Sequence, residues 1–262
     1  MSTARSVLVV LSGAKDINLK SGKSQETGFF LSELYVPLNM LERAGYRPIF
    51  TNPTGETPNM DPLSDHMVWF GAPGEYNKAK AWLKDHLEEQ SEGSLTRPIP
   101  FSAWGEADLL PIDGLFVPGG HAPMVDLHNN QNLGYIIHHF HRHAKPSGLI
   151  CHGPVALLSV NLAIPMDQHW PYTGYKMTAY SDKEEAFNEL LWRDRLQLHV
   201  EDALKDAGAR YEARWPLLPN VVEDRELITG QGPTSAWRFG EALLAALNTY
   251  DLSRVQSTPS VH

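Results

Sequence analysis

Cys151 and His152 are the residues of this sequence best suited to do chemistry. They follow the apolar run Gly148-Leu149-Ile150 and precede Gly153-Pro154, where a helix can begin because proline fits a first helical turn. The sequence therefore predicts that Cys151 lies on a sharp turn between a buried strand and a helix, where acyl-transfer enzymes hold a nucleophile. Such a turn would expose the sulfur, and the helix dipole would favour its thiolate. The alternative for a free cysteine is a small buried hydrophobe.

The composition is that of a globular protein and argues against several classes of partner. The 262 residues carry a net charge of −9, without a basic run beyond isolated pairs, so nucleic acid and anionic membranes are poor partners. The apolar run 7–11 is too short for a signal peptide, and no stretch reaches membrane-spanning length. A single cysteine forms no internal disulfide and suits a reducing compartment, so we expect a cytoplasmic protein.

Strands and helices are predicted to alternate along the chain. Apolar, β-branched runs or extended patterns predict strands at 6–11, 46–51, 114–117, 148–150, 175–181, 211–214, 221–222 and 226–229. Helical spacing predicts helices at 27–45, 79–89, 131–145, 196–208 and 235–247, with a loop running into a helix at 182–189. Pro37 should kink or break the first helix. This alternation predicts an α/β fold with a doubly wound, mostly parallel sheet and helices on both faces.

The chain is expected to form one domain with inserted loops. That domain would span residues 1–252, with irregular inserts near 52–79 and 91–108 and a flexible tail at 253–262. Long loops in a compact domain are more often functional than idle. No glycine-rich nucleotide-binding motif occurs in the sequence, in agreement with a reaction that needs no external cofactor.

Three segments far apart in the sequence are expected to meet. Residues 12–13, 118–121 and 151–152 each follow a predicted buried strand. In open parallel sheets, ligands bind beyond the carboxyl ends of the strands. These segments should therefore border one site.

Several motifs resemble those of the ThiJ/PfpI superfamily, which has a flavodoxin-like, class I glutamine amidotransferase-like fold. The best matches are Thr27–Glu33, Val117–His121 and Ile150–Pro154, and weaker ones are Gly174–Asp182 and Leu227–Pro233. The long inserts and the Thr-Gly…Glu…Pro pattern are most similar to the branch that contains heat-shock chaperones and glutathione-independent glyoxalases. The resemblance covers the chain from Ser6 to about Leu247.

The resemblance implies a set of site residues. Its nucleophile falls on Cys151, and a carboxylic acid within reach of the sulfur falls on Glu33. The histidine after the nucleophile, His152, would pair with an acid that falls on Glu185, with Asp182 and Glu184 as open alternatives. The oxyanion and substrate-binding positions would be the backbone N–H groups of Gly120 and His152, with Gly119 and His121 beside them. Glycine lets a backbone amide approach a ligand closely, and His121 is open between substrate contact and loop packing.

Neither group of residues considered as a metal site favours a metal. Some members of this branch carry a site of two histidines and one carboxylate, in which His121 could match one ligand, but Gly74 stands where a histidine is expected. His139 and His143 lie one helical turn apart and could chelate a metal. No carboxylate or cysteine stands at matching spacing in the sequence, so we predict a structural role for them.

The resemblance and the residues together imply a glyoxalase-like reaction if Glu33, Cys151 and His152 converge. The thiolate would attack the aldehyde carbon of methylglyoxal or a related 2-oxoaldehyde, and a base would move the carbon-bound proton to give a 2-hydroxy acid. The alternatives are a stress-response chaperone or cysteine redox sensor, hydratase or hydrolase chemistry on another small electrophile, and an inert binding module. We expect a small aldehyde as the binding partner, and a homodimer is a possible assembly of the chain.

Overall fold

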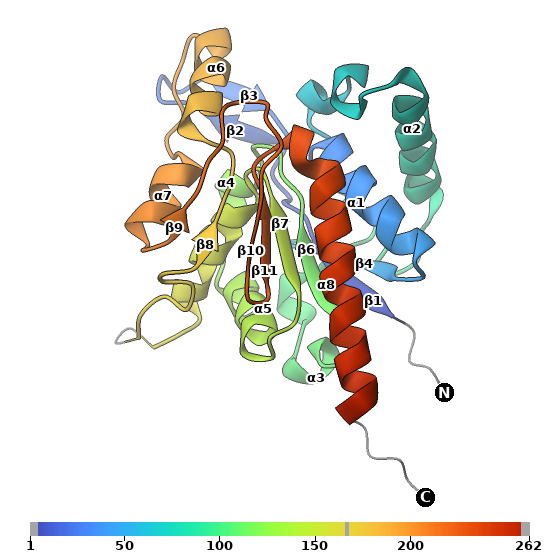
Figure 1. Ribbon diagram of the computed structural model, residues 1–262. Coiled ribbons are helices and arrows are strands. Elements are labelled where there is room, and N and C mark those ends of the chain that lie inside the picture. The colour runs from blue at the N-terminus through green and yellow to red at the C-terminus, as the bar shows by residue number, and fades with distance from the viewer. Residues whose placement is uncertain (1–4, 166–167, 258–262) are drawn as a thin grey trace, which may run out of the picture.

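The computed structural model describes residues 5–165 and 168–257 and is built around a seven-stranded sheet. The strand order is β10-β11-β7-β6-β1-β4-β5 (Figure 1), and neighbours pair in parallel except for β10 with β11. The strands are β1 (Ser6–Val10), β4 (Arg47–Asn52), β5 (Ile99–Pro100), β6 (Gly114–Val117), β7 (Ser147–Ile150), β10 (Val221–Asp224) and β11 (Leu227–Gly230). The predicted α/β class with a mostly parallel sheet is confirmed.

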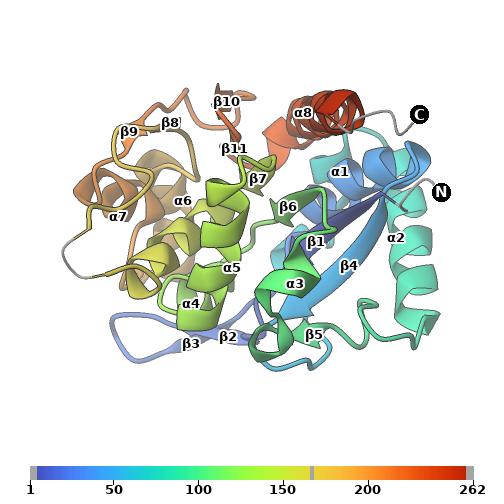
Figure 2. The ribbon, with the colours of Figure 1, turned by 90° about the horizontal axis from the view of Figure 1, so that it is seen from below.

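Helices cover both faces of the sheet, as the two views show (Figures 1 and 2). The α-helices are α1 (Leu31–Arg43), α2 (Pro73–Glu88), α3 (Glu106–Leu109), α4 (Pro123–Asp126), α5 (Gln131–Arg142), α6 (Asp182–Trp192), α7 (Val200–Asp206) and α8 (Ala236–Ser257). The 3₁₀ helices are η1 (Pro62–Ser64), η2 (Met67–Phe70), η3 (Phe101–Ala103), η4 (Gly153–Leu162) and η5 (Pro233–Ser235). Two small sheets pair β2 (Asp16–Asn18) with β3 (Ser24–Glu26) and β8 (Lys176–Met177) with β9 (Arg210–Tyr211). No helix in the described residues is both long and apolar enough to span a bilayer.

The central strand β1 contributes to two apolar cores. Val7 and Val9 pack in one core with residues of α1 and α8, and Leu8 and Val10 pack in the other with residues of α5 and η4. All five residues of β1 are buried. A parallel strand covered on both faces has no polar face, which is why this run is continuously apolar.

Strands β1, β6 and β7 end at the same edge of the sheet, and the segments that follow them meet there. The Ser12 hydroxyl donates to the carbonyl oxygen of Ala122 at 3.0 Å. Gly119, after β6, lies directly against Cys151, after β7. The predicted convergence of three strand ends is therefore present.

Helix α1 differs from its prediction in two ways. It begins at Leu31 and not at residue 27, because Phe29 forms a bridge with Met60 and Gly28 lies against the Asn59 carbonyl. It also continues through Pro37 to Arg43. The Pro37 backbone packs closely on Gly240 of α8, and such tertiary packing can hold a helix together through a proline.

Other boundaries also differ from the sequence analysis. The insert 52–79 contains η1, η2 and the start of α2, and the insert 91–108 contains β5, η3 and the start of α3. Of 175–181 only Lys176–Met177 is strand, 182–189 belongs wholly to α6, and the helix expected at 196–208 is shortened to α7. Helix α8 continues to Ser257, so the first residues of the predicted tail 253–262 are helical. Residues 258–262 lie outside the described part of the chain.

Candidate active site

Cys151 lies on the strand-to-helix turn that the sequence predicted. Its φ is +61°, a left-handed conformation that costs an L-residue about 1–2 kcal/mol. Two backbone hydrogen bonds hold it there, from its own N–H to Gly230 at 2.8 Å and from the Tyr180 N–H to its carbonyl at 2.9 Å. The next turn needs Gly153, because a Cβ there would lie 2.6 Å from the Val117 carbonyl oxygen.

The sulfur of Cys151 is buried, which corrects the expectation of an exposed thiolate. The residue is 2% exposed. Burial raises the pKa of the Cys151 thiol, the nearby Glu33 carboxylate raises it further, and a hydrogen bond from the Gly120 N–H only partly offsets both. The resting residue is therefore a thiol, and a base is needed to make it a nucleophile.

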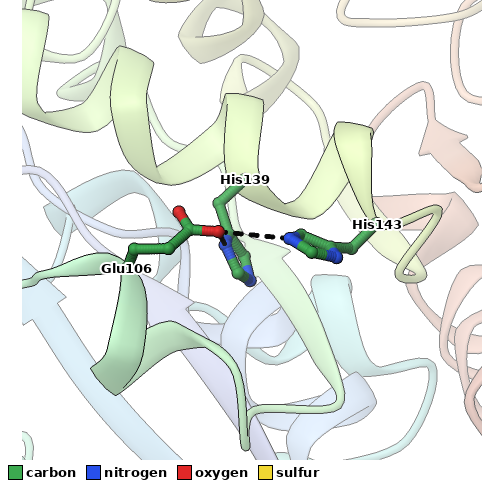
Figure 3. A group of neighbouring side chains, drawn as sticks. All are labelled: Glu106, His139 and His143. Carbon is green, nitrogen blue, oxygen red and sulfur yellow. Dashed lines mark hydrogen bonds and ion pairs between the residues drawn. The ribbon is translucent and has the colours of Figure 1, made fainter.

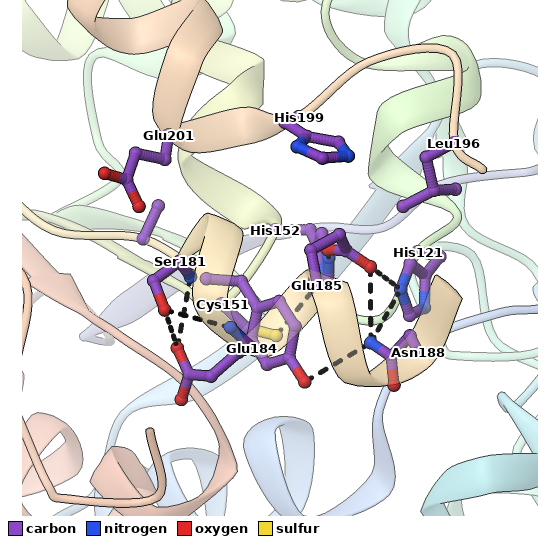
Figure 4. Close-up of polar contacts among 12 residues, drawn as sticks. His121, Cys151, His152, Ser181, Glu184, Glu185, Asn188, Leu196, His199 and Glu201 are labelled. Atoms are coloured by element: carbon purple, nitrogen blue, oxygen red, sulfur yellow. Dashed lines mark hydrogen bonds and ion pairs between the residues drawn. The ribbon is translucent and has the colours of Figure 1, made fainter. Parts of the chain in front are cut away.

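His152 is placed to act as that base. Its Nδ1 lies 3.2 Å from Cys151 Sγ, and its Nε2 lies 2.8 Å from Glu185 Oε2 (Figure 4). A carboxylate only accepts hydrogen bonds, so Nε2–H donates to Glu185 and Nδ1 is left as an acceptor facing the thiol. A thiol, a histidine and a carboxylate in this order have the arrangement of a nucleophile, its base and the group that orients the base.

His121 binds the same carboxylate from the other side. Its Nε2 donates to Glu185 Oε1 at 2.9 Å, and its ring lies 4.2 Å from the His152 ring between centroids. The Trp192 ring packs against His121, with centroids 4.9 Å apart. The sequence analysis left substrate contact and loop packing open for His121. The structure gives this side chain a third role, as part of the buried network around Glu185.

The two histidines in contact with Glu185 differ in charge preference. Burial opposes ionisation of Glu185, but the charges of His121 and His152 and their hydrogen bonds hold its pKa well below its usual range. Burial lowers the pKa of His152, and the charge of His121 lowers it further. For His121, burial is outweighed by the charge of Glu185, which raises its pKa. Of the two imidazoles, His121 therefore favours the protonated form, and His152 favours the neutral form that can accept a proton.

Glu33 also lies beside the sulfur of Cys151. A Cβ placed on Gly119 would be 2.5 Å from Glu33 Oε2 and 3.0 Å from Cys151 Sγ, so both atoms face the same point. Burial raises the pKa of Glu33 to about 8, although contacts with the Cys151 thiol and the Gly119 N–H favour its carboxylate. Glu33 therefore changes protonation state near neutral pH, as a proton shuttle requires.

The turn at Gly119 and Gly120 can be made only by glycine. Gly120 has a φ of +94°, and a Cβ there would lie 2.0 Å from the Gly28 carbonyl oxygen. The Gly120 N–H lies close enough to the Cys151 sulfur to lower the pKa of the thiol. The oxyanion role of the Gly120 and His152 N–H groups stays a prediction.

Glu184 and Asp182, the open alternatives to Glu185, have other contacts. Glu184 accepts from the Ser181 hydroxyl and from Gln231 Nε2 and completes the capping box of α6. Asp182 Oδ1 lies 3.4 Å from His199 Nδ1. Of these three acids, the His152 side chain contacts Glu185.

Three nearby residues were not found from the sequence. Asp61 is buried in the insert after β4, accepts from the Thr27 hydroxyl at 2.8 Å, and its charge raises the pKa values of Glu33 and His121. Asn188 Nδ2 donates to Glu185 Oε1 at 3.2 Å, and the Tyr180 ring packs on His152. The Asp61-Pro62 pair is a helix-start signal that could have indicated order in this insert.

The two-histidine, one-carboxylate metal set of the related branch does not fit this chain. Gly74, the position expected to supply a histidine, lies in the first turn of α2 and has no side chain. His121, the other histidine considered, already donates to Glu185. We therefore derive no step of the reaction through a metal at this set.

The sequence matches a known protein family and several individual proteins. Residues 26–186, more than half of the chain, match the DJ-1/PfpI family. The glutamine amidotransferase-like class 1 domain-containing protein 1 of Bos taurus is 37% identical over 134 residues, which are 49% of this chain and 59% of that protein. The match thus spans less than two thirds of that relative. The protein/nucleic acid deglycase HchA of Staphylococcus aureus is 26% identical over 242 residues, 90% of this chain and 77% of that protein.

Two solved structures superpose on nearly the whole of this chain. The Rapid Encystment Protein 24 kDa of Francisella tularensis superposes with a TM-score of 0.74 and 25% identity, covering 93% of this chain and 99% of that one. Glyoxalase III of Candida albicans has a TM-score of 0.74 at 24% identity, with 93% and 98% covered, which is evidence of a shared fold. This fold brings together the motifs around Glu33, Gly120 and Cys151, which all lie in the matched residues 26–186. The chain therefore belongs to the DJ-1/PfpI family, also called the ThiJ/PfpI superfamily.

Proposed function

We propose that the protein is a cofactor-free enzyme that converts methylglyoxal or a related 2-oxoaldehyde to a 2-hydroxy acid. The observation that carries this proposal is the pairing of the Cys151 thiol with His152 at 3.2 Å, with the Glu33 carboxyl also beside the sulfur. His152 can form the nucleophile while Glu33 moves a second proton. The reaction needs both operations at adjacent carbon atoms.

The first step forms a covalent adduct. His152 Nδ1 takes the thiol proton of Cys151 as the sulfur attacks the aldehyde carbon, and the aldehyde oxygen takes up a proton to give a hemithioacetal. Glu185 stays ionised and stabilises the imidazolium that forms. The Gly120 N–H, close to the sulfur, would stabilise the developing oxygen charge.

The second step moves a proton between neighbouring carbons. The Glu33 carboxylate removes the proton from the carbon bonded to sulfur, giving an enediol, and the proton returns to the adjacent carbon. The product is a thioester of the 2-hydroxy acid, and water hydrolyses it to release the acid and the Cys151 thiol. A pKa of about 8 lets Glu33 hold and release a proton near neutral pH. The burial of the site suits a substrate of a few atoms.

The relatives support an enzyme of this kind. A deglycase aligns with 90% of this chain, and a glyoxalase III shares its fold. The matched residues 26–186 include Glu33, Gly120, Cys151, His152 and Glu185.

The direct test is lactate formation from methylglyoxal in the absence of glutathione, with wild type and Cys151→Ala compared. Wild type should form lactate, and Cys151→Ala should not exceed the buffer rate, because no thiol is left to form the adduct. Equal rates in the two proteins would remove Cys151 from the reaction.

A chaperone is the second candidate, because helix α6 carries exposed apolar side chains. Phe187, Leu190 and Leu191 are 66%, 75% and 72% exposed. Client holding depends on such apolar area and should not respond to one buried carboxyl. Methylglyoxal turnover and suppression of a client's aggregation should be measured on one Glu33→Gln sample. An inactive wild type, with aggregation suppressed equally by both proteins, would favour the chaperone.

A further inference from the structure

A second group of two histidines and one glutamate lies away from Cys151. His139 and His143 come from the end of α5, and Glu106 is the first residue of α3 (Figure 3). The sequence analysis had found no carboxylate for these histidines, because Glu106 is distant in the chain and is brought in by the fold. The three ligand atoms all lie within 4.8 Å of one another.

This group lies at the edge of the sheet opposite to the active site. Helix α5 ends shortly before the start of β7, whereas Cys151 follows the end of β7. Helix α3 likewise precedes the start of β6, whereas Gly119 follows its end. The group therefore takes no part in the proposed reaction.

His139 is a buried imidazole whose nitrogens lack a suitable hydrogen bond. The residue is 1% exposed, and neither Nδ1 nor Nε2 has a hydrogen-bond partner of good geometry among the described residues. Nδ1 lies 3.0 Å from Glu106 Oε1, but this oxygen is outside the direction in which the nitrogen can hydrogen-bond. A buried polar atom without such a partner is costly and indicates an unseen ligand.

The distances from Glu106 to the two histidines are close to those between zinc ligands. Glu106 Oε1 is 3.0 Å from His139 Nδ1 and 3.2 Å from His143 Nε2. Ligands held tetrahedrally at zinc bond lengths lie about 3.3 Å apart, each roughly 35° off the other's bond to the metal. An oxygen close to Nδ1 but off its axis is thus the arrangement a bridging cation would produce.

Two positive side chains also face this group. Arg142 Nη2 contacts Glu106 Oε1 at 3.1 Å, and this side chain is 53% exposed, so it can turn to solvent. The Lys145 ammonium donates to the Leu109, Leu110 and Ile112 carbonyls, and its charge acts on His139. Both charges oppose a cation, which predicts that the site favours strong nitrogen coordination over purely ionic binding.

We propose that Glu106, His139 and His143 form a zinc site that ties α3 to α5. Imidazole and carboxylate are ligands that zinc accepts, and water would complete the tetrahedron. The bound ion would replace the contact between Arg142 and Glu106. It would stabilise the fold by linking an exposed short helix to the long helix packed against the sheet.

The experiment is a calorimetric titration of the chelator-treated, full-length protein with Zn²⁺, repeated on single-site variants. Glu106→Gln and His143→Gln remove ligands from exposed positions, so both variants should fold, which circular dichroism checks. His138→Gln is the matched control, because it removes a histidine of the same helix outside the group. Glu185→Gln tests the buried trio of His121, His152 and Glu185, whose ligand atoms also lie within reach of one ion.

Wild type, His138→Gln and Glu185→Gln should each bind one equivalent of zinc, and zinc should raise their melting temperatures. Glu106→Gln and His143→Gln should bind at least about tenfold more weakly, since the loss of outer-shell partners alone costs that much. The proposal is overturned if wild type binds no zinc or if both ligand variants bind it as wild type does. Loss of binding in Glu185→Gln alone would place the ion at the active site and would overturn it too.

Discussion

Two clusters of the same composition, two histidines and a glutamate, lie at opposite edges of one sheet. In the cluster at Cys151, Glu185 uses one oxygen for each histidine, at 2.8 and 2.9 Å, and all three side chains are buried. In the cluster of Glu106, His139 and His143, a single oxygen of the half-exposed Glu106 lies close to both histidines. The residue types are identical, but only the first cluster has each donor matched to its own acceptor.

The difference shows that hydrogen-bond matching decides what such a cluster can do. Complete matching at Glu185 fixes the tautomer of His152 and directs one lone pair at the thiol, which suits proton transfer. Incomplete matching at Glu106 leaves a buried imidazole without a good partner, and exposure lets an ion enter. Proton chemistry and metal binding are thus separated within one domain by geometry.

The largest effect should come from the same substitution made in both clusters. Glu185→Gln should lower methylglyoxal turnover by about 10²–10⁴-fold, because the amide no longer fixes the His152 tautomer or stabilises its charge. Glu106→Gln should leave turnover unchanged. Initial rates of lactate formation, with folding checked by circular dichroism, make the comparison, and equal rates in the two variants would contradict the assigned roles.

A second prediction concerns the pH dependence of stability. Burial raises the pKa of Glu33 from 4.5 to about 8 in the folded protein. Between these values the folded state keeps a proton that the unfolded chain has lost, so the free energy of unfolding should fall as pH rises, by up to about 1.4 kcal/mol per unit. Above pH 8 Glu33 is ionised in both the folded and the unfolded state, so this part of the stability no longer changes with pH.

Glu33→Gln should remove this dependence, because the amide does not titrate. Urea unfolding of wild type and Glu33→Gln at several pH values from 5 to 8 measures the difference. If the free energies of unfolding of the two proteins change with pH in parallel over this range, Glu33 titrates normally in the folded protein. The Glu106→Gln variant serves as the control, since that carboxyl is largely exposed.

Much of the fold could be predicted from the sequence, because the signals are local. The apolar runs of β1, β6 and β7 and the Gly153-Pro154 pair placed the sheet and the turn at Cys151 correctly. The start of α6 had a local signal too, the capping box of Ser181 and Glu184, although a loop running into a helix was predicted for this acid-rich stretch.

The parts that could not be predicted depend on tertiary packing. The turn at Cys151 was expected to expose its sulfur, yet segments distant in the chain, including Gly119 and Glu33, cover it. The meeting of Glu106 with His139 and His143 has no local spacing to reveal it. That Glu185 serves two histidines depends on where α6 docks, and the sequence analysis assigned it only one.

A smaller effect tests the burial of the nucleophile. Iodoacetamide should modify Cys151 at least about tenfold more slowly in the folded protein at neutral pH than in urea, because each unit of raised pKa lowers the thiolate fraction tenfold. Mass spectrometry over time gives both rates. Faster labelling of the folded protein would restore the exposed thiolate that the sequence alone suggested and would favour a redox sensor.

The smallest effect compares the caps of the two helices that carry the clusters. Ser181 caps α6 and Asn130 caps α5 through side-chain oxygens that accept backbone N–H groups. Ser181→Ala and Asn130→Ala should each lower the free energy of unfolding by about 1 kcal/mol. Only Ser181→Ala should also slow turnover, because Glu185 lies in the first turn of α6. Urea unfolding and lactate assays on both variants measure this, and a slowed Asn130→Ala would contradict it.

The left-handed backbone of Cys151 gives the protein a conflict between durability and activity. Glycine adopts a φ of +61° freely, whereas cysteine does so at a cost of about 1–2 kcal/mol. Selection for a sturdier fold alone would therefore drive this position toward glycine and erase the nucleophile. A lineage that keeps cysteine here holds a less stable domain in return for the reactivity of one sulfur atom.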